Sequence, residues 1–331
     1  MSEVLRGKRA LVTGGTGAFG RRFTRAFRDA GGRSLVLLSR DEMKHAAMRR
    51  ELGQQAADVE LRIGDITDPA DLQLALRGVD LVIHAAAMKH LPECEANVRA
   101  STRVNVLGTQ LVADAFLRSG AETLVFLSTD KAPYASSVYG AQKYIGEKIV
   151  TECARSAEQG RRAFSLRYSN VMDSTGSVFH VFRERLVAGK PAMVNGAQTE
   201  RGFVSQSEVL DVLGAALAAA RGGEVVVLVP RVVRIHELAN ALCKLIGKGE
   251  VQLAEGTAFL GEKESATLVM AEEARVAREL EGVPGGAAVL LDLLSRSSHR
   301  PPNEIAAKGL TLDACERLSG GELERYLTPL L

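Results

Sequence analysis

Tyr139 and Lys143 are four residues apart in the run Tyr139-Gly-Ala-Gln-Lys143. Residues at this spacing lie on one face of a helix, with their Cβ atoms about 5–6 Å apart. A phenol with its ordinary pKa of about 10 is a poor base at neutral pH, but a nearby ammonium favours the phenolate and lowers that pKa. The pair therefore predicts that Tyr139 accepts a proton from a substrate hydroxyl, although such a pair also occurs by chance in many helices.

A second group of polar residues, Thr129, Asp130 and Lys131, comes directly after the apolar run 123–127. An apolar run of this length is typical of a buried strand. In an open α/β sheet, ligands bind beyond the carboxyl ends of the strands, so these side chains are candidates to meet Tyr139. Asp130 and Lys131 could serve as an acid and a base, and the alternative is an ion pair at a strand end on the surface.

A glycine-rich loop follows the predicted strand 9–13 and precedes a predicted helix at 19–30. Its glycines are three residues apart, which lets the backbone turn tightly and approach a pyrophosphate at the helix N-terminus. The pattern predicts a dinucleotide site, and the alternative is a tight turn without a ligand. The residues expected to contact the cofactor here are Gly14, Thr16, Gly17, Ala18, Phe19 and Gly20.

The second predicted strand, 34–38, is followed by Ser39, Arg40 and Asp41. An acidic residue at this place would hold the ribose 2′-hydroxyl of NAD, whereas an arginine accommodates the 2′-phosphate of NADP. Ser39 and Arg40, with Lys44 one turn on, favour NADP over NAD. The alternative is that Arg40 is solvated and Asp41 contacts the ribose.

Further cofactor contacts are expected after the later strands. Asp65 follows the strand 60–63 and could bond the adenine amine or serve as a turn carboxylate. Small residues after the strand 81–84 would let the cofactor pass close, whereas His84 itself is expected to pack or to bond the backbone. The remaining candidates are Ile66, Ala85, Ala86, Ala87, Lys89, Asn105, Tyr168 and Asn170.

The order of these segments predicts the fold class. Apolar strands that alternate with helices are typical of a parallel sheet covered on both faces, so we expect an α/β, Rossmann-type doubly wound sheet. We assign residues 1–172 to a dinucleotide-binding domain, to which 203–229 return. Residues 173–202 and 230–331 are expected to form a smaller, substrate-binding lobe.

Composition excludes several other classes of function. The 331 residues carry a net charge of +2 and no basic tract, so we expect no nucleic-acid or membrane partner. The four scattered cysteines indicate a reducing cytoplasm and argue against zinc. No apolar run reaches the ~20 residues that span a bilayer, and the polar N-terminus is not typical of a signal peptide. We expect no metal, because the histidines lack partners at metal-ligand spacing.

With these motifs placed, the chain resembles the extended short-chain dehydrogenase/reductases. Within them it is most similar to the soluble UDP-N-acetylglucosamine 4,6-dehydratases of bacterial pseudaminic- and legionaminic-acid pathways, from residue 8 to 204. The Ser-Thr-Asp-Lys stretch at 128–131 and the Met-Lys-His-Leu-Pro loop at 88–92 separate this group from epimerases and simple reductases. The other motifs that carry the resemblance are residues 13–20, 39–42, 64–65, 105–109, 139–143 and 167–171.

The resemblance implies a 4,6-dehydratase that acts on a UDP-N-acetylglucosamine-like sugar in surface-glycan or nonulosonic acid biosynthesis, as a homo-oligomer. Hydride would pass from C4 to NADP, water would be eliminated across C5 and C6, and hydride would return to C6. Thr129, Tyr139 and Lys143 would form the hydride-transfer triad, while Asp130 and Lys131 act as acid and base. The substrate-binding residues implied are Lys89, His90, Asn170, Arg201 and Glu262.

Departures from the family pattern keep two other functions open. Thr175 and Phe259 stand where the family has arginines, which are the natural partners of a diphosphate. One alternative is a nucleotide-sugar C4 reductase or epimerase that uses only Thr129, Tyr139 and Lys143. The other is a cofactor-binding paralogue without catalytic activity.

Overall fold

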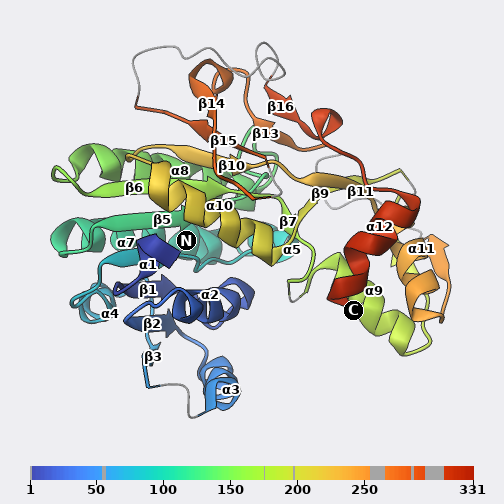
Figure 1. Ribbon diagram of the computed structural model, residues 1–331, viewed down its shortest axis with the longest axis horizontal. Coiled ribbons are helices and arrows are strands. Elements are labelled where there is room, and N and C mark those ends of the chain that lie inside the picture. Colours follow the sequence, from blue (N-terminus) through green and yellow to red (C-terminus); the bar gives the residue numbers. More distant parts are fainter. Residues whose placement is uncertain are drawn as a thin grey trace.

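A large, mostly parallel sheet forms the centre of the molecule (Figure 1). The computed structural model describes residues 2–53, 57–174, 176–196, 198–253, 265–284, 287–294 and 309–331. Within these ranges the large sheet has nine strands. Its parallel strands, in spatial order, are β3 (Val59–Ile63), β2 (Ser34–Ser39), β1 (Arg9–Thr13), β4 (Leu81–His84), β5 (Thr123–Leu127), β6 (Arg162–Arg167) and β10 (Val225–Leu228). Two antiparallel strands, β15 (Ala288–Leu291) and β14 (Ala277–Glu279), extend it beyond β10.

Helices cover both faces of this sheet (Figure 1). Successive strand residues point to opposite faces, and each face buries its own apolar set. Ala10 and Val12 pack with one group of helices, and Leu11 with the other. The first group is α1 (Ser2–Leu5), α2 (Ala18–Asp29) and α10 (Gln206–Ala219). The second group is α4 (Pro69–Ala75), α7 (Gly108–Arg118) and α8 (Val138–Ser156).

The remaining helices of this part lie at its edge and beside the carboxyl ends of the strands. They are α3 (Glu42–Leu52), α5 (Leu91–Ala96), α6 (Val98–Thr102) and the π-helical turn η2 (Arg103–Leu107), which joins α6 to α7. Short 3₁₀ turns are η3 (Ala274–Val276), η4 (Leu312–Ala314) and η5 (Thr328–Leu330).

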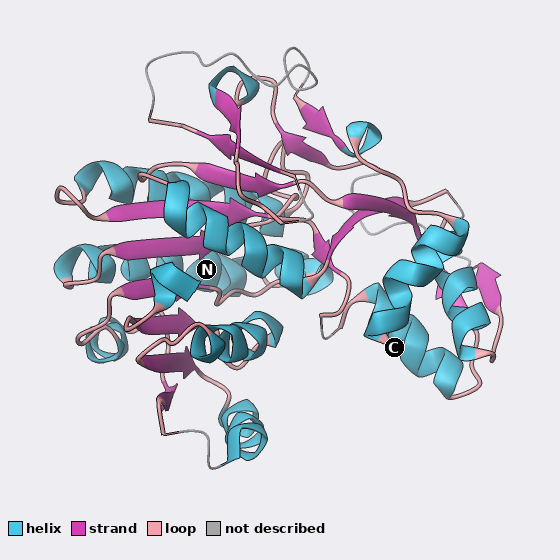
Figure 2. Ribbon diagram, viewed as in Figure 1, coloured by secondary structure: helices cyan, strands magenta, loops and turns pink. Residues whose placement is uncertain are grey.

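A smaller lobe lies beside the large sheet, at the right of Figure 2. Its helices pack around a separate apolar cluster that includes Phe179, Phe182 and Leu242. They are α9 (Val178–Val187), α11 (Ile235–Ile246) and α12 (Gly320–Leu327). Three short sheets complete the fold. They are β7 (Asn170–Val171) with β9 (Glu200–Val204) and β11 (Arg231–Arg234), β8 (Ala192–Val194) with β12 (Val251–Leu253) inside the smaller lobe, and β13 (Thr267–Val269) with β16 (Leu310–Thr311).

The predicted fold class is confirmed: this is a Rossmann-type doubly wound sheet. Residues 225–228 return to the large sheet, next to β6. The strands β14 and β15 also join it, although their residues were expected in the smaller lobe. Strand β6 was not predicted, because its ends are Arg162 and Arg167 and no long apolar run marks it. The division of the chain into cofactor and substrate domains stays a proposal.

No helix in the described part of the chain is long and apolar enough to cross a membrane.

Candidate active site

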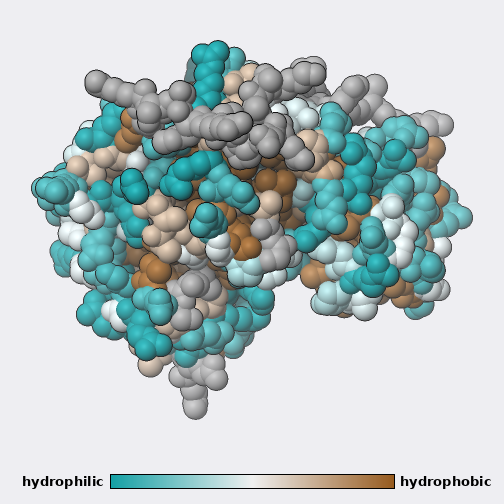
Figure 3. Space-filling view, turned by 45° about the horizontal axis from the view of Figure 1, so that its top comes forward, coloured by the Kyte–Doolittle hydropathy of each residue, from teal (hydrophilic) through white to brown (hydrophobic). Residues whose placement is uncertain are grey.

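A cavity of about 1220 Å³ opens where the carboxyl ends of the parallel strands face the smaller lobe. Figure 3 shows one hollowed face of the molecule, with hydrophobic residues gathered toward the notch between the two parts. The sheet order reverses between β1 and β4, which is where open α/β sheets bind their ligands. Residues from both the large sheet and the smaller lobe line this cavity.

The glycine loop forms the floor of the cavity beside β1. Gly14 has a φ of +66°, and a Cβ added there would lie 2.9 Å from the Ala86 backbone. A Cβ on Gly20 would lie 2.0 Å from the Gly15 carbonyl oxygen, so only glycine fits where α2 begins. Gly17 is the N-cap of α2 and, among the described residues, no side chain caps the helix. The loop therefore leaves backbone N–H groups open at a helix N-terminus, which suits a pyrophosphate.

The far end of the cavity lies beyond β2. Arg40 and Lys44 line it, and the Arg40 guanidinium lies 3.6 Å from the Asp65 carboxylate. Asp41 caps α3, because its side chain accepts a hydrogen bond of 3.0 Å from the Lys44 N–H. Asp41 also lines the cavity, and its second carboxylate oxygen lies 3.4 Å from the Lys44 Nζ. Ser39 is held by a 2.9 Å hydrogen bond to the Thr16 hydroxyl.

Ala85, Ala86 and Ala87 pass along the cavity wall after β4, as expected, while His84 is buried behind them. The His84 ring is hydrogen-bonded to Thr13 at 2.7 Å and to Thr109 at 3.0 Å. Burial, with a smaller contribution from the Lys143 charge, lowers the pKa of His84 to about 3, so this imidazole is neutral. His84 ties β1 and β4 to α7 and takes no part in the cavity surface.

Asn105 lies in the π-helical turn η2 and is 1% exposed. Its amide accepts from the Met88 N–H at 2.8 Å and donates to the Met88 carbonyl at 2.9 Å. It also donates to Gln142 on α8 at 2.8 Å. Neither Asn105 nor Asp65 lines the cavity: Asn105 is buried behind Met88, and Asp65 is partly exposed beside Arg40. Asn105 fixes the loop that carries Lys89 and His90.

Thr129, Asp130 and Lys131 lie together after β5, with Thr129 and Lys131 on the cavity wall. Asp130 is 2% exposed, so the pair that it forms with Lys131 is not a surface ion pair. The Asp130 Oδ1 accepts hydrogen bonds from the Lys131 Nζ at 2.9 Å and from the Thr129 hydroxyl at 3.1 Å. Lys131 also donates to the Asn170 side chain at 3.2 Å.

Tyr139 and Lys143 lie on the buried face of α8 and both line the cavity. Two contacts fix the start of this helix: Ser137 accepts from the Gly140 N–H at 3.1 Å, and Glu95 accepts from the Val138 N–H at 2.7 Å. The Lys143 Nζ donates to the Leu127 carbonyl at 2.6 Å and lies 4.3 Å from the centre of the Phe126 ring. The predicted juxtaposition with the end of β5 is therefore present.

The pKa of Tyr139 shifts in the direction opposite to the one predicted. Burial raises the pKa of Tyr139, and Tyr168, Asp130 and Cys94 raise it further. Burial also lowers the pKa of Lys143 to about 7, against the opposing effect of Glu147. The prediction from helical spacing was wrong in direction, because spacing says nothing of how deeply both groups are buried. Tyr139 is a neutral phenol in this state of the protein.

The end of the cavity opposite Arg40 lies against the smaller lobe. Lys89, His90, Asn170 and Arg201 line it, and the Arg201 guanidinium donates to the Glu200 carbonyl at 2.8 Å. Glu262, Thr175 and Phe259 lie outside the described residues. The sequence analysis missed the apolar and polar side chains that complete this end, because no motif marks them: Val178, Val181, Phe182, Met193, Asn195, Thr199, Gln206 and Ile235.

Among the described residues, no three His, Cys, Asp or Glu side chains gather as metal ligands would.

The parallel sheet, the glycine loop after β1 and the Tyr–Lys pair on α8 define an extended short-chain dehydrogenase/reductase. More narrowly, the chain belongs to the family described as "Polysaccharide biosynthesis protein", which matches residues 10–284.

Named relatives point to two reactions within this superfamily. A UDP-N-acetylglucosamine 4,6-dehydratase (inverting) of Campylobacter jejuni strain 81-176 is 31% identical over 83% of this chain and 81% of its own. A UDP-glucose 4-epimerase of Rickettsia akari is 33% identical over the same shares. The solved structure of Pen from Bacillus thuringiensis aligns over 99% of both chains, with a TM-score of 0.90 and 25% identity. The chain is therefore similar to nucleotide-sugar dehydratases and epimerases.

Proposed function

We propose that this protein is an NADP-dependent nucleotide-sugar 4,6-dehydratase that acts on a UDP-N-acetylglucosamine-like substrate in the cytoplasm. The observation that carries the proposal is the arrangement of Thr129, Asp130 and Lys131 beside Tyr139. Oxidation of C4 needs only Thr129, Tyr139 and Lys143. Elimination of water also needs an acid and a base, which the buried Asp130 and the cavity-lining Lys131 would supply. The free state of all four cysteines fits a reducing compartment.

A dinucleotide fits the glycine loop, as the close approach of Gly14 to Ala86 and the open start of α2 indicate. Arg40 and Lys44 at the far end of the cavity favour a 2′-phosphate, and the charge of Asp41, which lines the same end, is offset by its contacts with the α3 backbone and with Lys44. When bound, NADP would supply the acceptor and later the donor of hydride. The diphosphate of the sugar would be held at the opposite end, where Arg201 lines the cavity.

The residues then divide the proton transfers between them. Tyr139 accepts the proton of the C4 hydroxyl, which requires positive charge beside it because burial raises its pKa. Lys143 supplies that charge. Lys131 removes the proton at C5, made acidic by the 4-ketone, and Asp130 donates a proton to the departing C6 oxygen.

Lys131 and Asp130, joined by a 2.9 Å hydrogen bond, would each change protonation state during the elimination. Elimination begins with a neutral amine and a protonated carboxyl, and it ends with an ammonium and a carboxylate. C5 needs a proton when C6 is reduced, and the Lys131 ammonium gives it back. The proton that Tyr139 took from the C4 hydroxyl passes to the Asp130 carboxylate, so that all three groups return to their starting state. Thr129 donates to the same oxygen, so the buried Asp130 carboxyl is bonded to two residues, Thr129 and Lys131, that line the cavity.

Asp130→Asn tests this proposal. The amide keeps the size of the side chain but cannot donate a proton as an acid, so UDP-N-acetylglucosamine with NADP should yield reduced cofactor, seen by absorbance. The C6 oxygen should stay in place by mass spectrometry. A variant that forms a 6-deoxy-4-keto sugar at the wild-type rate would contradict the role of Asp130.

The epimerase alternative has support of its own, since the Rickettsia akari relative is named a UDP-glucose 4-epimerase. In that case Asp130 and Lys131 would serve only to position Thr129 and Asn170. The wild-type protein would then convert UDP-glucose or UDP-N-acetylglucosamine to its C4 epimer without loss of water. Mass spectrometry of the product separates the two reactions.

A further inference from the structure

Helix α8 carries a third buried ionisable residue in line with the proposed catalytic pair. Glu147 follows Lys143 by four residues, as Lys143 follows Tyr139, so the three share one face of the helix. Glu147 is completely buried. It contacts neither the cavity nor solvent, and the steps proposed above do not use it.

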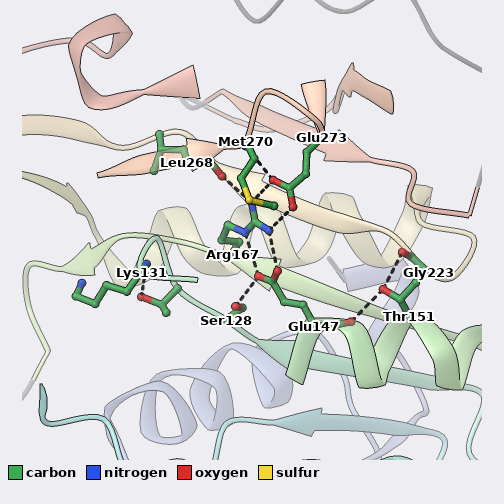
Figure 4. Close-up of polar contacts among 10 residues, drawn as sticks. Ser128, Lys131, Glu147, Thr151, Arg167, Gly223, Leu268, Met270 and Glu273 are labelled. Carbon is green, nitrogen blue, oxygen red and sulfur yellow. Dashed lines mark hydrogen bonds and ion pairs between the residues drawn. The ribbon is translucent and has the colours of Figure 1, made fainter. Parts of the chain in front are cut away.

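Figure 4 shows the hydrogen bonds that surround Glu147. The Ser128 hydroxyl donates to its Oε1 at 2.6 Å. The Arg167 guanidinium donates to both carboxylate oxygens, at 2.9 Å from Nε and 2.7 Å from Nη2. Ser128 directly precedes Thr129, and Arg167 directly precedes Tyr168 on the cavity wall, so Glu147 joins the ends of β5 and β6 to the catalytic helix.

Glu273, which follows β13, contacts Arg167 on the side away from Glu147. These three residues form one buried charged cluster. The two carboxylate oxygens of Glu273 accept from Arg167 at 2.8 and 2.9 Å, and one of them also accepts from the Met270 N–H at 3.0 Å. Burial alone would raise the pKa of Glu273, but the hydrogen bonds and charge of Arg167 outweigh burial and hold it below its ordinary value.

The charges of this cluster do not cancel by themselves. Glu147 and Glu273 carry two negative charges and Arg167 one positive charge, all of them almost fully buried. An uncompensated charge is costly in such surroundings. Lys143, one helical turn from Glu147 and 4% exposed, is the buried cation that balances them when it is protonated.

We propose that Glu147, held by Arg167 and Ser128, is a positioning residue that keeps Lys143 in its ammonium form and thereby prepares Tyr139 to accept a proton. The inference rests on the proposed function, in which Tyr139 needs a cation beside it. The pKa of Lys143 supports this role for Glu147. Burial lowers that pKa to about 7, and the charge of Glu147 acts in the opposite direction, toward the ammonium.

The other titratable groups around the Tyr139–Lys143 pair offer no equivalent negative charge close to Lys143 within the described part of the chain. His84 on β4 is neutral, because burial lowers its pKa to about 3. Tyr168 after β6 is a phenol whose pKa burial raises to about 12. Asp130 after β5 is already paired with Lys131. Leu127 and Phe126 of β5 contact the ammonium through a carbonyl and a ring.

The experiment measures the protonation of Lys143 directly. The full-length protein is labelled with ¹³Cε-lysine, and the Lys143 resonance is assigned by its absence in Lys143→Arg. Its chemical shift is then followed by NMR between pH 5 and 10 without substrate or cofactor. Because no turnover is needed, failure of this inference and failure of the proposed reaction are seen separately.

Glu147→Gln should lower the titration midpoint of Lys143 by about one pH unit, the low end of the shift that a nearby opposite charge produces, because Glu147 is shared with Arg167. Glu147→Asp keeps the charge and should titrate closer to the wild type. Glu152→Gln, an exposed carboxylate on the same helix, should leave the midpoint unchanged. A purely structural role predicts reduced thermal stability in Glu147→Gln with an unchanged midpoint, and that result would overturn the proposal.

A second variant covers the case in which Glu147→Gln does not fold. Glu273→Gln leaves Glu147 and Ser128 in place but removes half of the negative charge around Arg167. The field at Lys143 becomes more positive, so its midpoint should fall by less than in Glu147→Gln. A Glu273→Gln protein that folds and titrates at the wild-type midpoint would refute the charge-balance argument.

Discussion

At the scale of single residues, burial changes the pKa values of the side chains in the candidate site and so decides what chemistry they can do. Tyr139 and Lys143 have the expected spacing, yet burial raises the pKa of the phenol and lowers that of the amine. Both shifts favour the neutral forms. The charge that makes the pair useful must therefore come from its neighbours, and Glu147 is the nearest buried carboxylate along the helix.

Tyr139→Phe should reduce formation of the 4-keto product by about 100-fold or more, the low end of what a positioned acid–base group supplies. Only one hydroxyl is lost, so the melting temperature and cofactor affinity should stay close to the wild type. Tyr144→Phe, on the same helix and outside the cavity lining, is the matched control. A Tyr139→Phe protein that keeps more than about a hundredth of the wild-type rate would exclude Tyr139 as the base.

Arg40→Ala should weaken binding of NADP and leave NAD almost unaffected, because only NADP carries the 2′-phosphate that Arg40 would contact. Affinities for both cofactors can be measured by calorimetry. Arg50→Ala, exposed on α3 and away from the cavity, should change neither. Equal losses of affinity for NAD and NADP would mean that Arg40 does not bind the 2′-phosphate.

At the scale of elements, the site depends on where helices begin. Helix α2 starts against the glycine loop with no side-chain cap among the described residues, and α8 starts on the Ser137 and Glu95 contacts. Each start brings its helix to the carboxyl ends of neighbouring strands. The loop before α2 can then hold a cofactor, while α8 carries Tyr139 to the end of β5.

Gly20→Ala should displace the start of α2, because the new Cβ would lie 2.0 Å from the Gly15 carbonyl oxygen. Overpacking of this kind typically costs about 1–3 kcal/mol of unfolding free energy, and dinucleotide affinity should fall as well. Gly120→Ala is the control, since nothing lies within 4 Å of its added Cβ. Urea unfolding and cofactor titration measure both effects, and equal behaviour of the two variants would contradict the steric argument.

At the scale of the whole molecule, the large sheet and the smaller lobe meet around one cavity. The wall of this cavity contains an ionisable group, Lys143, that folding buries. Lys143 lies in that cavity wall with a pKa lowered to about 7, whereas an unfolded lysine has a pKa of about 10.4. The folded state therefore holds fewer protons than the unfolded state between these two values. The unfolding free energy of the chain should therefore depend on pH through this one buried amine.

The unfolding free energy of the wild type should rise with pH, relative to Lys143→Met, between about pH 7 and 10. The slope of the difference should not exceed about 1.4 kcal/mol per pH unit, the value for one proton. Below pH 7 Lys143 is protonated in both the folded and the unfolded protein, and the difference should become flat. Urea unfolding of both proteins at several pH values checks this, and a flat difference throughout would show that Lys143 titrates normally.

Much of the fold could be read from local patterns, because each parallel strand is buried on both faces and is therefore apolar throughout. β1, β4 and β5 begin and end at the residues expected, and Asp68 caps α4 with Pro69 at its first turn. The glycine loop was also evident, since its glycines meet a steric requirement that acts within one loop. β6 and β14 were not, because charged residues interrupt the apolar pattern: β6 begins and ends with arginine, and β14 contains Arg278 and Glu279.

The sequence by itself determined which groups could do chemistry: the glycine loop, the Thr–Asp–Lys run and the Tyr–Lys pair follow from residue type and spacing. Only the tertiary structure decided their electrostatics. Burial reversed the expected shift at Tyr139, and Asp41 and Asn105 turned out to bond α3 and Met88. Arg167 and Glu273 meet across 106 positions of the chain only because β6 and the segment after β13 fold together. A pKa depends on desolvation and on charges brought close by folding, and neither is encoded in the spacing of neighbours along a chain.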